Sequence, residues 1–200
     1  MKSIKLWATI SAVFLAAVSQ AYVVNFDDLA PFTSLDNTTY AGVYFGSSSD
    51  NATVDAGFFV VYNGTDYATP HSGSNYIFDG YGPNNLYFDF GTPVSFQGAW
   101  FSSTFGLGPE DEATKVRFHD DLGNTSDWLD LSDTPQFLAA NFSGSTTVYV
   151  ERSGGPNASQ WYAMDDLTYN GGAQPPVPEP ATLLALGLGA SAVLRKRRRS

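Results

Sequence analysis

Two pairs of adjacent aspartates are the residues whose type and spacing most clearly suggest chemistry. Asp27-Asp28 follows the first segment with strand character, and Asp165-Asp166 lies in the last such segment. Each pair is followed by a leucine. The first and last strands of a two-sheet β domain commonly lie side by side, so these carboxylates are expected to converge although they are far apart in sequence.

Converging carboxylates repel one another and raise each other's pKa unless a cation lies among them. Calcium suits such a place because it accepts roughly six to eight oxygen ligands in loose geometry. Side chains alternate along a strand, so only one aspartate of each pair can face a shared site. We therefore predict a structural Ca2+ site that includes Asp27 and Asp165. The alternative is that all four aspartates are solvated acids at strand edges.

Catalytic chemistry has little support in the sequence. The chain has no cysteine and two histidines, His71 and His119, so a conventional nucleophilic site would need serine, histidine and aspartate. No Gly-x-Ser-x-Gly elbow is present, and His119 and Asp120 would point to opposite faces of a strand. The acidic run at residues 110–112 is more typical of a solvated turn than of paired glycosidase carboxylates. We expect a protein that is not an enzyme.

Carbohydrate binding is an alternative, because sugars stack on exposed aromatic rings. The aromatic residues considered for this role are Trp100, Trp128, Trp161, Tyr81 and Tyr87. Aromatic side chains more often fill the core of a β-sandwich, so most of these are expected to be buried. Trp128 follows the Gly123-Asn124 turn and lies among acidic residues. It is the residue predicted to be exposed and to bind a glycan.

A three-part tail closes the chain. The motif Pro178-Glu179-Pro180 comes first, and its two prolines keep the backbone extended and withhold two amide donors. An apolar run follows at residues 181–194. The final part is a basic cluster that favours the cytoplasmic side of a membrane, made of Arg195, Lys196, Arg197, Arg198 and Arg199.

This tail, residues 177–200, resembles the PEP-CTERM sorting signal of bacteria that export proteins through an exosortase. The resemblance implies a membrane-bound exosortase as a partner, a transient anchor in the inner membrane, and later release to the cell surface or extracellular matrix. The apolar run would form a single helix of about 21 Å, shorter than the roughly 30 Å hydrocarbon layer. That length favours a transient anchor over the alternative, a permanent one.

The opposite end predicts export as well. Lys2 and Lys5 precede an apolar segment at residues 6–18, and Ser19-Gln20-Ala21 is a small-x-small cleavage site. Residues 1–21 therefore have the organisation of a secretory signal peptide. Residues 22–172 remain as one secreted domain, joined to the tail by a linker at residues 173–176.

The charge of that domain excludes several partners. Seven of the ten lysines and arginines lie in the two ends, leaving Lys115, Arg117 and Arg152 against nineteen acids, a net charge of −16. Nucleic acid and anionic membrane surfaces would be repelled. Without cysteine, stability must come from the hydrophobic core.

The domain sequence predicts strands and turns rather than helices. The expected strands are residues 22–26, 57–62, 75–81, 86–90, 94–102, 115–119, 126–131, 136–142, 146–151 and 161–169. Residues 30–53 have the composition of a long loop or an irregular edge of the sheet, and the Asn63-Gly64 dipeptide is a hairpin signal. These features predict an all-β domain, a single β-sandwich of eight to ten strands and of jelly-roll type.

The domain resembles the secreted jelly-roll domains often found ahead of PEP-CTERM tails, and it is similar to galactose-binding-like and carbohydrate-binding modules. The resemblance rests on the echo of residues 25–29 in residues 163–167, with residues 93–98 and 116–124 between them. Two function classes follow. The first is a non-enzymatic exported surface or matrix protein associated with exopolysaccharide or biofilm. The second is a carbohydrate-binding module that acts as an adhesin.

Overall fold

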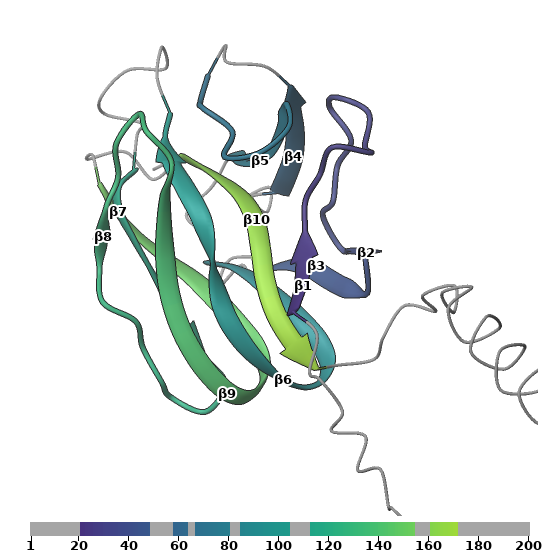
Figure 1. Ribbon diagram of the computed structural model, residues 1–200, viewed down its shortest axis with the longest axis vertical. Helices are drawn as coiled ribbons and strands as arrows, with labels where there is room; N and C mark the ends of the chain where they lie inside the picture. Colours follow the sequence, from purple (N-terminus) through teal and green to yellow (C-terminus); the bar gives the residue numbers. More distant parts are fainter. Residues whose placement is uncertain are drawn as a thin grey trace, which may run out of the picture.

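The computed structural model describes residues 21–48, 58–63, 67–80, 85–104, 113–154 and 161–171 (Figure 1). In these ranges every regular element is a β-strand. The predicted signal peptide before Ala21, the acidic run at 110–112, the linker and the whole tail lie outside the described residues. The expected C-terminal helix is therefore not described.

Ten strands form one sheet. They are β1 (Ala21–Val24), β2 (Thr38–Tyr40), β3 (Val43–Ser48), β4 (Phe58–Asn63), β5 (Asn75–Gly80), β6 (Asn85–Ser103), β7 (Ala113–Asp120), β8 (Leu129–Asp130), β9 (Gln136–Gly154) and β10 (Tyr162–Gly171). Their order is β4-β5-β10-β6-β9-β7-β8, and in addition β1 pairs with β10 and β3 pairs with β2 and β6. All of these pairings are antiparallel.

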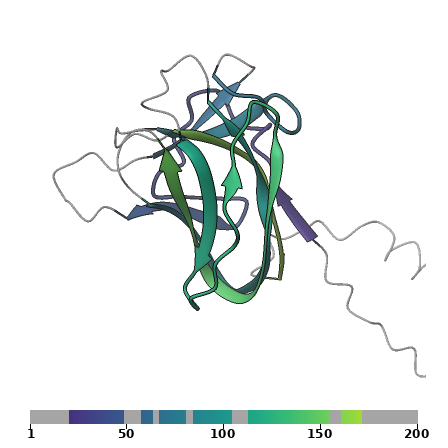
Figure 2. The ribbon, with the colours of Figure 1, turned by 90° about the vertical axis from the view of Figure 1, so that its left-hand side faces the viewer.

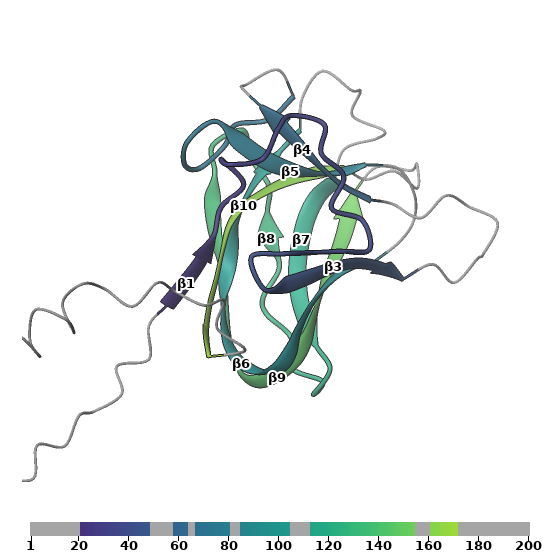
Figure 3. The ribbon, with the colours of Figure 1, turned by 90° about the vertical axis from the view of Figure 1, so that its right-hand side faces the viewer.

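The sheet curls into a half-barrel around its two longest strands, β6 and β9 (Figure 2). One half of β6 pairs with β3 and the other half with β10, while β9 follows β6 along nearly its full length. Figure 3 shows β3 at a steep angle to β7, β8 and β10. The predicted all-β, sandwich-like fold is confirmed, and the curled sheet is compatible with a jelly-roll-like domain.

Two predicted interruptions are instead bends within continuous strands. Residues 86–90 and 94–102 both belong to β6, and residues 136–142 and 146–151 both belong to β9. The register shifts between Asp89 and Val94, and Gly91 and Gly144 have positive φ angles of 67° and 80°. A bulge of this kind accommodates glycine and proline within a strand, so that the pairing of the two strands continues beyond it. It also bends the strand and increases the curl of the sheet.

The prediction of a long loop or irregular edge at residues 30–53 did not include the regular strands β2 and β3. These strands form a hairpin in which Tyr40 pairs with Val43, so that two residues make the turn. Ala41 and Gly42 have φ angles of 50° and 82°, the positive values that a type I′ turn requires at both positions. Ala-Gly is a weaker hairpin signal than Asn-Gly, which explains why the turn was missed.

The Asn63-Gly64 dipeptide does end a strand, but it does not form a tight hairpin. β4 and β5 pair antiparallel from Phe58↔Gly80 to Asn63↔Asn75, and residues 64–74 connect them. The second part of this connection, residues 67–74, crosses to β10 and carries His71. We call residues 67–74 the His71 loop.

The core is rich in phenylalanine. Phe96 is fully buried and packs edge-on against Phe118 at 4.8 Å between ring centroids, with Phe90 at 6.0 Å and Phe142 at 6.3 Å. Each buried phenylalanine contributes about 1.5–3 kcal/mol by removal of apolar surface from water. This packing takes the place of the disulfides that the composition rules out.

The beginning and end of the described domain lie side by side. β1 pairs with β10 in the register Ala21↔Asn170 through Val24↔Leu167 (Figure 1). The expectation that the first and last strands are neighbours is confirmed. This pairing brings the segment after β1, with Asp27, to the same region as Asp165 and Asp166 of β10.

Candidate functional site

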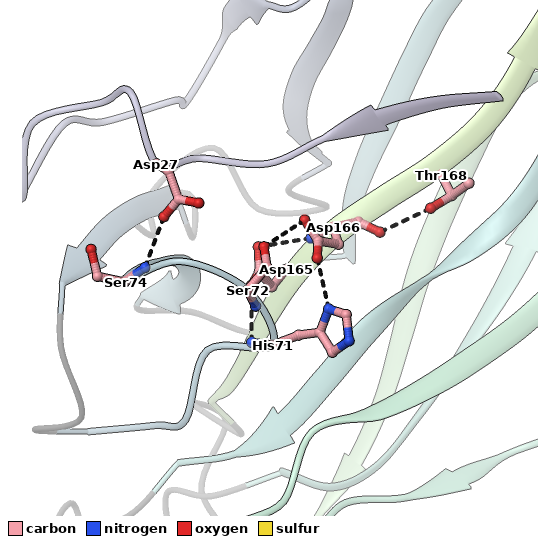
Figure 4. A network of polar contacts seen from close by, with 7 residues as sticks. All are labelled: Asp27, His71, Ser72, Ser74, Asp165, Asp166 and Thr168. Atoms are coloured by element: carbon pink, nitrogen blue, oxygen red, sulfur yellow. Dashed lines mark hydrogen bonds and ion pairs between the residues drawn. The ribbon is translucent and has the colours of Figure 1, made fainter. Parts of the chain in front are cut away.

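The His71 loop is held against β10 by Asp165. Oδ2 of Asp165 accepts hydrogen bonds from the backbone amides of His71 and Ser72, both at 2.9 Å, and Oδ1 accepts the amide of Asp166 at 2.8 Å (Figure 4). Asp165 is 3% exposed, so these amides replace the water that its carboxylate would otherwise bind. Asp165 is therefore an internal anchor for the loop.

Asp166 contacts the same loop, which contradicts the prediction that only one aspartate of the pair could face it. Its Oδ2 lies 2.7 Å from Nδ1 of His71, and its Oδ1 accepts a 3.0 Å hydrogen bond from the Ser72 hydroxyl. Asp166 has a φ of 47°, and the register of β10 against β6 shifts between Asp165 and Thr168. This bulge cancels strict alternation, and aspartate tolerates the left-handed conformation.

The imidazole of His71 is fixed on a second side by Trp100 of β6. The two rings are stacked, with centroids 3.5 Å apart and planes 11° apart. The Ser72 hydroxyl bonds to Asp166 and not to the imidazole. These residues are therefore not ordered as the nucleophile, base and acid of a catalytic triad.

Asp27 holds the other end of the loop. Its Oδ1 accepts the backbone amides of Ser74 at 2.9 Å and of Asn75 at 3.0 Å (Figure 4). Gly73 has a φ of 52°, and a Cβ placed on it would lie 1.9 Å from Oδ2 of Asp27. The Asn75 amide completes the anchor by donating to the carbonyls of Phe26 and Leu29 at 2.8 and 2.9 Å.

The electrostatics of this anchor are dominated by burial. Burial raises the pKa of Asp165 to about 6, and the neighbouring Asp166 charge adds to the rise, while the amide hydrogen bonds from Ser72, Asp166 and His71 act against it. The side chain of Asp165 thus titrates in a range where an ordinary aspartate is fully ionised.

The two residues predicted to bind calcium, Asp27 and Asp165, both contact the His71 loop. Asp165 binds its His71 and Ser72 end, and Asp27 binds Ser74 and Asn75, so the described partners of both carboxylates are backbone amides. Among the residues with assigned positions, no group of three or more acidic or histidine side chains is arranged to hold a metal ion. The calcium site stays a prediction.

Trp128, the predicted glycan-binding residue, is 39% exposed as expected. The guanidinium carbon of Arg117 lies 4.5 Å from the centre of its ring, a cation–π contact. Arg117 also pairs with Glu151 of the neighbouring strand at 2.7 Å. Trp128 therefore has one ring face against Arg117, which in turn pairs with Glu151.

His119 and Asp120 lie on opposite faces of β7, as predicted. His119 stacks on Tyr149 at 4.7 Å on the outer face, whereas Asp120 is 4% exposed on the inner face. Burial alone would raise the pKa of Asp120, but hydrogen bonds from Asn124, Ser145 and Leu122 lower it overall. Asp120 is a turn anchor, and it does not contact the His71 loop in any described interaction.

Sequence reasoning missed the roles of His71, Ser72 and Asp166. His71 and Asp166 are 95 positions apart, and no periodicity or motif links them. The one signal available was the convergence of the two aspartate pairs, which indicates the region but not the loop that fills it.

Comparison with known proteins supports the interpretation of the tail. A family model of the PEP-CTERM protein-sorting motif matches residues 176–199, which include Pro178, Glu179 and Pro180 and the basic cluster from Arg195 to Arg199. The resemblance of the tail to this sorting signal is confirmed. No curated protein matches the chain.

The motif defines the class of protein: an exported protein with an exosortase sorting signal, directed to the cell surface and processed by a membrane enzyme. Within the described residues, no helix is long and apolar enough to cross a membrane. The apolar run at residues 181–194 lies outside them. The similarity of the domain to galactose-binding-like jelly rolls remains a prediction.

Proposed function

We propose that this protein is a non-enzymatic component of the cell surface or extracellular matrix, exported through a signal peptide and released from a transient inner-membrane anchor by exosortase. It is associated with exopolysaccharide or biofilm. The single observation that carries the proposal is the sorting motif at residues 176–199. The charge of the domain, −16, suits a soluble extracellular protein and opposes binding to nucleic acid.

The arrangement of the domain supports this proposal. β1 begins at Ala21, the last residue of the predicted signal peptide, and β10 ends at Gly171, close to the predicted linker. Ala21 and Asn170 are directly paired, so the start of β1 and the end of β10 lie at the same edge of the domain. Because its first and last strands pair with each other, the domain can fold while one end of the chain is held at the membrane.

Processing can be tested by intact-mass measurement of the protein that the native host releases. We expect a mature form that starts near Tyr22, ends near the sorting motif and lacks Arg195, Arg197 and the rest of the basic cluster. Simultaneous replacement of Pro178, Glu179 and Pro180 by alanine should leave the protein in the membrane fraction.

The matched control replaces Gln174 and Pro175 with alanine. These residues precede the matched motif, so release should be unchanged. A mature protein that still carries the basic cluster, or a control variant retained as strongly as the motif variant, would contradict processing by exosortase.

The second function is that of a carbohydrate-binding adhesin, favoured by the exposure of Trp128. A glycan array with the released protein and its Trp128→Ala variant tests this second function. An adhesin built on Trp128 binds a defined set of glycans, and Trp128→Ala weakens the binding. No binding, or glycan binding that Trp128→Ala leaves unchanged, would contradict this role of Trp128.

A further inference from the structure

A row of aromatic side chains crosses four neighbouring strands on the outer face of the sheet. Tyr87 of β6 pairs with Tyr149 of β9, and Tyr149 pairs with His119 of β7. Tyr44 of β3 lies beside Tyr87, with ring centroids 6.2 Å apart. Tyr87 and Tyr149 are separated by 5.7 Å, and Tyr149 and His119 by 4.7 Å. We call these four residues the aromatic row.

The aromatic row belongs to the solvent side of the sheet and not to the core. Leu86 and Phe88, on either side of Tyr87, are buried and face the core. On the adjacent strands Val150 and Phe118, which are next to Tyr149 and His119, are buried as well. All four members of the row are partly exposed. The row spans three strand spacings, about 14 Å. That length exceeds a single sugar ring and suits a chain of them.

Polar side chains flank the row on both sides. On one side lie Asp89 of β6 and Thr147 of β9, which pair with each other, and Asp89 also pairs with Tyr44, the member of the row that is out of register with Tyr87. On the other side the ion pair of Glu151 and Arg117 leads to Trp128. The core of a protein–protein interface is depleted in charged residues, so this mixture of rings and charges is untypical of a docking surface for a protein.

A hollow of about 380 Å³ adjoins the row at Tyr44. Its lining includes Tyr44, Asp89, Thr39 and the backbone of Gly42 and Gly91. Ligand sites combine apolar or aromatic walls with a few polar groups that orient the ligand. A sugar fits this combination, because its C–H face packs on a ring while its hydroxyls bond to a carboxylate or a threonine.

Gly46 is the fourth position in register with the row and leaves room for the ring of Tyr87. A Cβ on Gly46 would lie 2.3 Å from Cζ of Tyr87. The aromatic ring therefore lies over the backbone of β3, which holds it flat against the sheet. A larger residue at this position would displace the ring without removing it.

We propose that the aromatic row, together with the hollow beside Tyr44, is a binding face for a neutral polysaccharide. A neutral polymer is the occupant because the domain has a net charge of −16, which repels acidic glycans. This inference deepens the proposed association with exopolysaccharide and rests on it. It gives that association a surface, a ligand class and residues distinct from the His71 loop.

The test uses the full chain, purified in a detergent without a sugar headgroup, and calorimetric titration with soluble polysaccharides. The neutral probes are hydroxyethylcellulose, galactomannan and dextran, and alginate is the acidic comparator. We expect binding to at least one neutral polymer and none to alginate. Failure to bind any of the three neutral polymers, or preference for alginate, overturns the proposal.

Variants locate the site. Tyr149→Ala should raise Kd at least about tenfold, equivalent to about 1.4 kcal/mol, and Tyr149→Phe should restore binding because the ring is retained. Gly46→Ala should weaken binding by displacing Tyr87. Phe137→Ala is the control, since Phe137 is an exposed aromatic residue that packs on Trp100 instead, at 5.6 Å.

Three outcomes contradict the inference: an effect of Phe137→Ala equal to that of Tyr149→Ala, unchanged binding in Gly46→Ala and Tyr149→Ala, or self-association of the chain that Tyr149→Ala abolishes. The last would make the face an interface between copies. If Tyr149→Ala does not fold, the inference is tested by Gly46→Ala, which should weaken glycan binding, and by Tyr149→Phe, which should retain it. If the chain binds neutral glycans in this titration but the native host does not release it, the proposed export is contradicted and the proposed binding face is not. The two results are independent because the titration does not depend on sorting.

Discussion

The backbone N–H of His71 donates a 2.9 Å hydrogen bond to Oδ2 of Asp165, a residue 94 positions further along the chain. This bond joins the connection between β4 and β5 to the last strand of the sheet. The acceptor is 3% exposed and lies beside Asp166. The loop is thus held by the carboxyl group of Asp165, and the burial of that group disfavours its ionised form. The stability of the protein should therefore depend on pH.

We expect Asp165 to stabilise the fold at low pH and to lose that contribution as the pH rises. Its pKa is raised from 3.8 to about 6. Below about pH 4 both the folded and unfolded states hold the proton, whereas between about pH 4 and pH 6 only the folded state keeps it. The free energy of unfolding should therefore fall by about 3 kcal/mol across this window and then level off.

Urea denaturation at several pH values between 3.5 and 7.5 measures this dependence. Asp165→Asn should remove the decline, because its side chain does not titrate. Asp127→Asn is the matched control, since Asp127 is exposed and should leave the decline intact. An equal slope in wild type and Asp165→Asn would show that other groups cause it.

Asp120 should have the opposite pH dependence. Its carboxylate accepts hydrogen bonds from Leu122, Asn124 and Ser145, and its pKa is lowered. A lowered pKa contributes stability above the unfolded value of 3.8, and the contribution is lost as the pH falls through the folded value. Asp120→Ala should reduce the free energy of unfolding by about 3 kcal/mol at pH 7, because it leaves buried donors without partners.

The measurement is again urea denaturation, at pH 7 and at pH 2.5. The difference between wild type and Asp120→Ala should narrow at the lower pH. Ser145→Ala removes one of the donors and serves as the graded control, with a loss of about 1 kcal/mol. A difference that grows towards acid pH would contradict the assigned role of the carboxylate.

Gly73→Ala should destabilise the His71 loop. Its φ of 52° disfavours any residue with a Cβ, and the added carbon would also clash with the carboxylate of Asp27. The conformational cost alone is about 1–2 kcal/mol, and the clash adds to it. Thermal unfolding measures the total loss.

Gly123→Ala is the control for this variant. Gly123 has a φ of 86°, but a Cβ there would have no neighbour within 4 Å, so its loss reports the conformational cost alone. A larger loss for Gly73→Ala than for Gly123→Ala measures the contact with Asp27. Equal losses would mean that the loop shifts freely and is not anchored by this carboxylate.

The calcium prediction is tested by melting the protein in millimolar calcium and in chelator. A structural ion at Asp27 and Asp165 should raise the melting temperature, by the equivalent of about 2.7 kcal/mol at a hundredfold excess over its Kd. Asp27→Asn should abolish the increase, and Asp133→Asn, at an exposed position, should preserve it. Identical melting temperatures with and without calcium would remove the site.

The sequence by itself determined the sorting signal and the class of fold. An exosortase signal is a short linear pattern of two prolines, an apolar run and a basic end, so its recognition needs no tertiary contact. Strand character is also local, because alternation and turn residues act over a few positions. For this reason the sequence indicated most of the strands, including β1 and β10. That these two strands are neighbours was expected from the type of fold and not from a local pattern.

Only the tertiary structure decided how the polar and aromatic side chains meet. Asp165 and Asp166 contact the same loop because of a bulge and a positive φ at Asp166, which strict alternation cannot anticipate. Tyr87 and Tyr149 become neighbours through the register of β6 against β9, 62 positions apart in the chain. Register between distant strands depends on the packing of the whole core, so it becomes fixed only when the sheet closes on its phenylalanine side chains.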